Sequence, residues 1–155
     1  HTNEITCLSV SSDNKRVLSG SSDFSVEVWD IDSGELPVDP ITGFSTEVCS
    51  VVFLAKSAQV AGFVIPFRVI IWSIVTGEIV QTICVKFEDI STFTFLSDEN
   101  YIAIGCLDTI SIWSRETQKQ IYTSWKGHTK TVEQLCANET NLLSHGKDGT
   151  LSIWN

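Results

Sequence analysis

Four of the five tryptophans recur at nearly constant intervals along the chain. Each of the four follows Val or Ile, and successive members are 43, 41 and 41 residues apart: Trp29, Trp72, Trp113 and Trp154. Polar segments that favour turns recur in step with them, as in "DSGE" at 32–35, "VTGE" at 75–78 and "ETQK" at 116–119. A fixed period of this length predicts a repeat architecture. The repeats fall at roughly 1–42, 43–84, 85–126 and 127–155, the last being incomplete.

Short runs rich in β-branched and aromatic residues lie between the turns, at 5–10, 48–53, 69–72 and 90–95. Such runs predict β-strands, and no stretch shows sustained helical periodicity. Several runs are apolar on both faces, as "RVIIW" at 68–72 shows, which indicates a sheet that neighbours cover on both sides. We therefore expect an all-β protein of stacked antiparallel sheets, each with about four short strands.

Charge and cysteine content exclude several classes of function. The net charge is −9 and the pI is about 4.6, which disfavours nucleic-acid binding and favours basic partners. The five cysteines are odd in number and at least 22 residues apart, so neither a disulfide framework nor a zinc site is expected. They indicate reduced thiols in an intracellular protein, which we expect to be cytoplasmic, with the nucleus as the alternative. No membrane span is expected, because the most apolar run, at 60–72, contains Pro66 and Arg68.

The first and last repeats carry the fullest motifs. "GHTKTVEQL" at 127–135 precedes "LLSHGKDGTLSIWN" at 142–155, and "HTNEITCLSV" at 1–10 precedes "VLSGSSDFSVEVWD" at 17–30. These segments resemble the WD40-repeat β-propeller family, whose repeats are about 40–45 residues long. The resemblance implies propeller blades of four-stranded antiparallel sheets, here a partial propeller of about four blades.

The resemblance also implies a buried network of His, Ser, Asp and Trp in each blade. In this chain its members would be His1, Ser19, Asp23 and Trp29 in the first repeat, and His128, Ser144, Asp148 and Trp154 in the fourth. Indole only donates, hydroxyl and imidazole donate and accept, and carboxylate accepts, so such a chain satisfies its buried polar atoms. A hydrolytic triad uses the same residue types, but the set occurs twice at equivalent positions. We therefore expect a structural role and no catalytic residue.

The middle repeats depart from this pattern. The second repeat has Phe44 where His belongs and Gly62 and Pro66 at the Ser and Asp positions, so only Trp72 remains. The network cannot form there, and we expect bulky neighbours to compensate: Phe63, Ile65 and Phe67.

The third repeat keeps two of the network residues. Asp108 and Trp113 are present, but Ile104 occupies the Ser position. The network is therefore expected to be partial at best in this repeat.

The resemblance implies a non-catalytic protein–protein interaction scaffold or adaptor that needs no cofactor or metal. The alternative is the regulatory propeller region of a larger multidomain enzyme or signalling protein. In this family the residue just before the Asp of the network tends to face the upper surface, which implies protein-binding positions at Ser22, Ile65, Leu107 and Lys147. Ile65 and Leu107 would form an apolar patch there, unless their turns tuck them inward. Trp125 is expected to pack in an outer strand, with an interface role as the alternative.

The ends of the chain fall within repeats, which raises the question of how the ring closes. The expectation is a piece of a ring of about seven blades in a longer protein. In the alternative, two copies complete one eight-bladed ring, and only then is a homodimer expected.

Overall fold

The computed structural model describes residues 1–42, 44–54, 58–64, 68–85 and 90–155, apart from the side chains of 123 and 124. The described part of the chain is built from fourteen strands and divides into two units, 1–84 and 85–155. Each unit contains two antiparallel sheets. The expected all-β fold class is confirmed.

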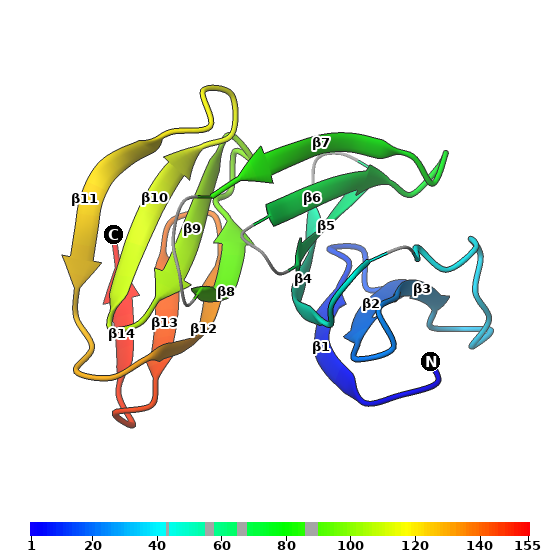
Figure 1. Cartoon of the computed structure of the whole chain (residues 1–155), viewed down its shortest axis with the longest axis horizontal. Coiled ribbons are helices and arrows are strands. Elements are labelled where there is room, and N and C mark those ends of the chain that lie inside the picture. Colours follow the sequence, from blue (N-terminus) through cyan, green and yellow to red (C-terminus); the bar gives the residue numbers. More distant parts are fainter. Residues whose placement is uncertain (43, 55–57, 65–67, 86–89) are drawn as a thin grey trace. The chain divides into compact units, whose positions relative to one another are not determined.

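Unit 1 contains the first and second sheets (Figure 1). The first sheet has the order β1-β2-β3 and the second β4-β5-β6-β7. Their strands are β1 (Ile5–Val10), β2 (Arg16–Ser21), β3 (Val26–Asp30), β4 (Val48–Leu54), β5 (Gln59–Val64), β6 (Arg68–Ser73) and β7 (Ile79–Cys84).

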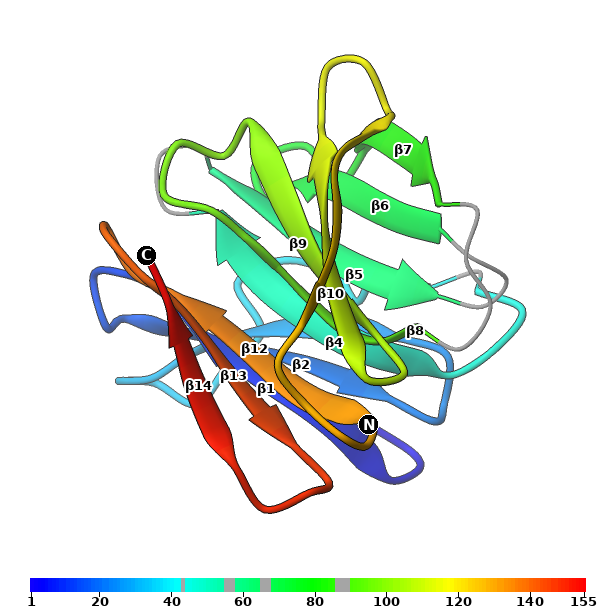
Figure 2. The same cartoon turned by 90° about the vertical axis from the view of Figure 1, so that its left-hand side faces the viewer.

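Unit 2 contains the third and fourth sheets, and Figure 2 shows β12, β13 and β14 side by side in the fourth. The third sheet has the order β11-β10-β9-β8 and the fourth β12-β13-β14. Their strands are β8 (Ile90–Phe95), β9 (Tyr101–Cys106), β10 (Thr109–Ser114), β11 (Gln120–Lys126), β12 (Val132–Ala137), β13 (Leu142–Gly146) and β14 (Leu151–Trp154).

The strands agree closely with those predicted, with one exception. The runs at 5–10 and 90–95 are confirmed to the residue by β1 and β8. The first repeat, however, forms only three strands, and its outer segment contributes one isolated bridge, between Val26 and Ile41. The segment contains Pro37 and Pro40, which have no backbone N–H to donate to a ladder. A fourth strand is therefore replaced by a single contact.

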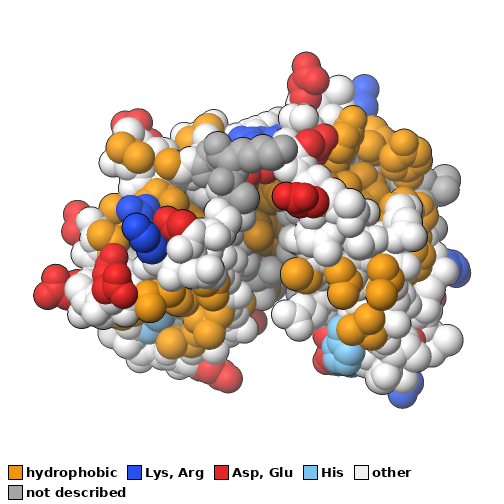
Figure 3. Space-filling view, turned by 180° about the vertical axis from the view of Figure 1, so that it is seen from behind, with side chains coloured by type: hydrophobic (Ala, Val, Ile, Leu, Met, Phe, Trp, Pro, Cys, Tyr) orange, Lys and Arg blue, Asp and Glu red, His pale blue; other side chains and the backbone are white. Residues whose placement is uncertain are grey.

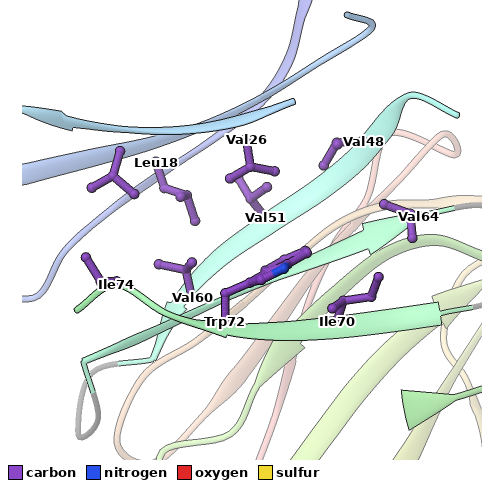
Figure 4. Close-up of a cluster of buried hydrophobic side chains, with 10 residues drawn as sticks. Leu18, Val26, Val48, Val51, Val60, Val64, Ile70, Trp72 and Ile74 are labelled. Carbon is purple, nitrogen blue, oxygen red and sulfur yellow. The ribbon is translucent and has the colours of Figure 1, made fainter. Parts of the chain in front are cut away.

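In each unit a hydrophobic core joins the two sheets. In unit 1, Leu18, Val26 and Val28 of the first sheet pack in one cluster with Val51 and Trp72 of the second. Figure 4 shows Trp72 among the aliphatic side chains of both sheets. Unit 2 repeats the arrangement, with Ala103, Ile110 and Ile112 packed with Val132, Leu135 and Leu142. Stacking of sheets thus buries the two-sided apolar strands that the sequence contains.

A β-bulge interrupts the same place in all four sheets. The pairing register shifts between Ile5 and Cys7, Val48 and Ser50, Ile90 and Thr92, and Val132 and Gln134. The bulged residues are Thr6, Cys49, Ser91 and Glu133. Because an extra residue bends a strand and re-aims a side chain, each first strand presents one side chain in a special direction.

Candidate functional site

The polar side chains of the fourth sheet form a continuous hydrogen-bonded chain. Trp154 donates its indole N–H to Ser144 Oγ at 2.9 Å, and Ser144 Oγ lies 2.7 Å from His128 Nε2. His128 Nδ1 lies 3.3 Å from Asp148 Oδ1 and 3.0 Å from the Thr150 hydroxyl. The structure therefore brings all four predicted residues together, and adds Thr150.

The direction of these hydrogen bonds follows from the donors available. Trp154 N–H only donates, so Ser144 Oγ accepts there and directs its own hydrogen toward His128 Nε2. His128 then carries its proton on Nδ1, where Asp148 accepts it. Ser144 is 1% exposed and His128 is 5% exposed, so a substrate cannot reach the hydroxyl in this structure. The arrangement has the connectivity of a hydrolytic triad without the access that a nucleophile requires.

The first sheet repeats the arrangement with the same atoms. Trp29 N–H donates to Ser19 Oγ at 2.8 Å, and Ser19 Oγ lies 2.6 Å from His1 Nε2. His1 Nδ1 lies 3.0 Å from Asp23 Oδ2 and 3.0 Å from Ser25 Oγ. Ser25 thus takes the part that Thr150 plays in the fourth sheet.

Both carboxylates are held as anions by several donors. Asp148 accepts a hydrogen bond from the Thr150 hydroxyl at 2.7 Å and from the Thr129 N–H at 2.7 Å, which hold its pKa well below the usual range. For Asp23, burial by itself raises the pKa, but the Ser25 hydroxyl at 2.6 Å and the Thr2 N–H at 2.8 Å outweigh it and lower the pKa. These bonds tie the turn between the second and third strands to the segment before the first strand.

The third sheet keeps a Trp–Ser hydrogen bond through a serine that the repeat alignment does not predict. Trp113 N–H donates to Ser111 Oγ at 3.1 Å, and both residues are buried. Ser111 pairs directly with Ile104, so the hydroxyl comes from the partner strand rather than from the Ser position. Lys86, at the His position, lies outside the described residues. The expectation from the alignment missed this bond because it compares positions along the sequence and not across strands.

The second sheet replaces polar contacts around Trp72 with apolar ones. The Phe44 ring meets Trp72 edge to face, with centroids 5.3 Å apart and planes at 79°. A Cβ on Gly62 would lie 3.2 Å from the Trp72 ring, so the missing side chain makes room for the indole. Phe63 is buried, but strand alternation places it on the opposite face of β5 from Gly62. The compensation at Trp72 thus comes from Phe44 rather than from Phe63, while Ile65 and Phe67 lie outside the described residues.

The glycine before His128 is required by the Trp154 ring. A Cβ on Gly127 would lie 2.3 Å from Cη2 of Trp154, far inside contact distance. Packing therefore explains the glycine of the Gly-His motif, because the backbone at Gly127 runs directly across the Trp154 indole.

A family model, described as "WD domain, G-beta repeat", matches residues 1–30 and 118–155. The solved structure titled "Structure of U3-55K" superposes with a TM-score of 0.83 over all of this chain and 47% of that chain, at 21% identity. The chain has the fold of a WD40 propeller, and its resemblance to the WD40-repeat family model covers residues 1–30 and 118–155. Its four sheets are WD40 propeller blades, and the two matched stretches contain the blades with complete networks.

Curated relatives support the same assignment over nearly the whole chain. Autophagy-related protein 16 of Arabidopsis thaliana is 24% identical over 95% of this chain, and the U3 snoRNP-associated protein-like EMB2271 of the same plant is 28% identical over 100%. The SIR4-interacting protein SIF2 of Saccharomyces cerevisiae is 23% identical over 99%. The chain spans only 29%, 28% and 31% of these relatives' lengths, respectively.

The four predicted protein-binding positions lie in different settings. Leu107 is 51% exposed in a two-residue turn, with a φ of 49°. Lys147 is exposed, and Ser22 is half-buried with its hydroxyl 3.1 Å from the Glu47 carboxylate. Ile65 lies outside the described residues, so its side chain is not placed beside Leu107. Figure 3 shows hydrophobic side chains reaching the surface among acidic ones.

Trp125 lies in the outer strand of the third blade and faces the fourth. Its ring stacks on Trp154, with centroids 5.5 Å apart and planes at 21°. A cavity of about 140 Å³ adjoins the pair and is lined also by Ile112, Leu142 and Asn141. Trp125 thus packs between two blades of unit 2 while one side of it remains accessible.

Hydroxyls at the bulges link neighbouring blades, a feature that the sequence analysis missed. Thr6 Oγ1 donates to the Val48 carbonyl of the next blade and lies 3.0 Å from Gly20 O. Ser91 Oγ makes the same contacts in unit 2, with Val132 O and with Gly105 O at 3.3 Å. The available signal was that Thr6 and Ser91 lie at equal distance from the His position of their repeats, which His1 and Lys86 occupy.

Other classes of site find no support within the described ranges. No group of three or more His, Cys, Asp or Glu side chains there could hold a metal ion. All five cysteines are free thiols. In the same part of the chain, no helix is long and apolar enough to cross a membrane.

Proposed function

We propose that this chain is a non-catalytic protein–protein interaction scaffold, with recognition by the turns between the second and third strands of the blades. One observation carries the proposal: the chemically suggestive Ser, His and Asp side chains are used in internal hydrogen bonds, whereas Leu107 and Lys147, one in each of two turns, are exposed. The names of two relatives, "SIR4-interacting" and "snoRNP-associated", describe association with other macromolecules. Such names, with "autophagy-related", also support an intracellular location, cytoplasmic or nuclear.

The partner is a protein with a basic surface. The chain carries 19 acidic and 10 basic residues, and a net charge of −9 attracts positive partners and repels nucleic-acid backbones. An exposed Leu suits an apolar pocket, and a few anchor residues buried near the centre carry most of the binding energy in interfaces. Ser22, Ile65, Leu107 and Lys147 are the residues that we assign to this surface.

The test is to purify a partner with the protein, identify it, and measure its Kd by titration calorimetry against two aspartate variants. Leu107→Asp is expected to weaken binding about tenfold or more, because it places a charge in an apolar contact. Val75→Asp is the matched control, since Val75 is 79% exposed and lies in the turn at the opposite end of its sheet. An unchanged Kd for Leu107→Asp would remove the turn surface from the proposal.

A hydrolysis assay tests whether the protein is catalytic. The protein is screened with generic ester and peptide substrates beside Ser144→Ala. Turnover that disappears in this variant, while circular dichroism shows an intact fold, would overturn the non-catalytic proposal.

A further inference from the structure

Strand β7 is the outermost strand of the second blade among the described residues. Strand β7 pairs with β6 on one side, and it ends the four-stranded order β4-β5-β6-β7 in the described part of the chain. A strand at the edge of a sheet offers backbone groups to a further strand.

The composition of β7 leaves this edge unprotected. Its sequence "IVQTIC" has no charged residue and no Pro, and Ile79 and Val80 are 61% and 49% exposed. Natural proteins usually block open edges with Lys, Pro or short strands. The outer strand of the other four-stranded sheet, β11, follows this rule, because Lys119 precedes it and Lys126 ends it. The contrast marks β7 as an edge that is available for pairing.

Opposite charges lie at the two ends of this edge. Glu78 immediately precedes β7 and is exposed, whereas Arg68, also exposed, pairs with Cys84 at the far end of the strand. A parallel strand of the same sequence would place like charges together. An antiparallel copy would instead bring the acidic end of one edge toward the basic end of the other, so the edge is complementary to itself.

We propose that β7 is a homodimerisation edge, at which a second copy of this chain pairs antiparallel about a two-fold axis between Gln81 and Thr82. The two four-stranded sheets would then form one continuous eight-stranded sheet. In this register Ile79 lies opposite Cys84 of the second copy, and Val80 lies opposite Ile83. The contact is isologous and therefore closes at two copies. It uses the perimeter of a blade and is independent of how the propeller ring is completed.

Cross-linking tests the register directly. Directly opposed residues of an antiparallel pair lie about 4.5–5.5 Å apart between Cα atoms, which suits a disulfide. Ile79→Cys is expected to form a covalent dimer on mild oxidation, with peptide mapping showing the bond to native Cys84 and Ile79→Cys/Cys84→Ser losing it. Val75→Cys is the control, because position 75 lies before the strand. Equal dimer in the control, or bonds that map elsewhere, would overturn the register.

Charge exchange tests the two-fold symmetry. Sedimentation velocity at low salt is expected to show a concentration-dependent dimer, which Glu78→Arg or Arg68→Glu weakens about fivefold each. The double variant is expected to restore it, because both ends of the edge are exchanged. Val80→Lys is expected to abolish the dimer with no loss of melting temperature. A protein that stays monomeric at high concentration, association that Val80→Lys leaves intact, or open-ended assembly instead of a dimer would each refute the proposal.

Discussion

At the residue scale, the indole N–H of each tryptophan with a polar partner is bound by a serine, but not always by the same serine. Trp29 and Trp154 use Ser19 and Ser144, which belong to the second strand of their blades. Trp113 uses Ser111, two residues earlier on its own strand. A buried indole N–H without a partner is costly, so the requirement is for a hydroxyl at that point in space. The hydroxyl can come from either of two residues that pair with each other across the second and third strands of the blade.

We therefore expect Ser111→Ala to lower the free energy of unfolding by about 1–3 kcal/mol, because it removes the hydroxyl that accepts the hydrogen bond of the buried Trp113 N–H. Urea denaturation followed by Trp fluorescence measures the change. Ser152 holds the equivalent position in the fourth blade, where Ser144 already binds Trp154, so Ser152→Ala is expected to cost less than about 0.5 kcal/mol. Equal losses in the two variants would contradict this account of Ser111.

At the element scale, the residue at the bulge in the first strand makes different contacts in different blades. Thr6 and Ser91 direct a hydroxyl onto the carbonyl of the adjacent blade. At the same bulge Cys49 has a thiol 3.8 Å from Glu47 O, and Glu133 forms an exposed pair with His145 at 3.6 Å. The irregularity is constant, and the residue on it decides whether a polar link to the neighbour forms.

Thr6→Val is accordingly expected to lower unit 1 stability by about 1 kcal/mol, since it keeps the side-chain shape and removes the hydrogen bonds to Val48 O and Gly20 O. Hydrogen exchange of the amides in β1 and β4 is the measurement, with faster exchange expected in both strands. Cys49→Ala serves as the control, because its thiol hydrogen-bonds to Glu47 O, just before its own strand. If both variants exchange alike, the bulge hydroxyl does not join the blades.

At the scale of the whole molecule, the two carboxylates of the networks make stability depend on pH. The folded-state pKa values of Asp23 and Asp148 are both lowered, so their contribution is present above the ordinary carboxyl range. It is lost as the pH falls below about 4, where the unfolded chain takes up protons first.

Chemical denaturation between about pH 7 and pH 3 is expected to show a falling free energy of unfolding, with a shallower slope in Asp148→Asn. That variant removes one of the two network carboxylates, while Asp13 and Asp30, whose pKa values are also lowered, stay unchanged, and it keeps the side-chain size. A slope identical to that of the unchanged protein would show that Asp148 does not contribute.

The sequence predicted the fold through its period, and it predicted the network residues of the first and fourth repeats through their motifs. It could not predict Ser111, because that contact depends on which residues face each other across β9 and β10. Phe44 was recognised as a departure from the motif, but its edge contact with Trp72 requires the packing of two blades. Pro37 and Pro40 were the only sequence signal that the first repeat lacks a fourth, outer strand. Local motifs were sufficient to predict the network contacts of the regular repeats. In the irregular repeats, the prediction also needs the pairing register of the strands and the packing of the blades.

The stacked pair Trp125 and Trp154 is expected to give unit 2 a distinct near-UV circular-dichroism signal. Two indoles held 5.5 Å apart and nearly parallel couple their electronic transitions, whereas Trp29 and Trp72 in unit 1 have no such stacked neighbour among the described residues. Trp125 belongs to the third blade and Trp154 to the fourth. The circular-dichroism signal of this pair therefore reports the packing of these two blades, separately from the packing of the first two.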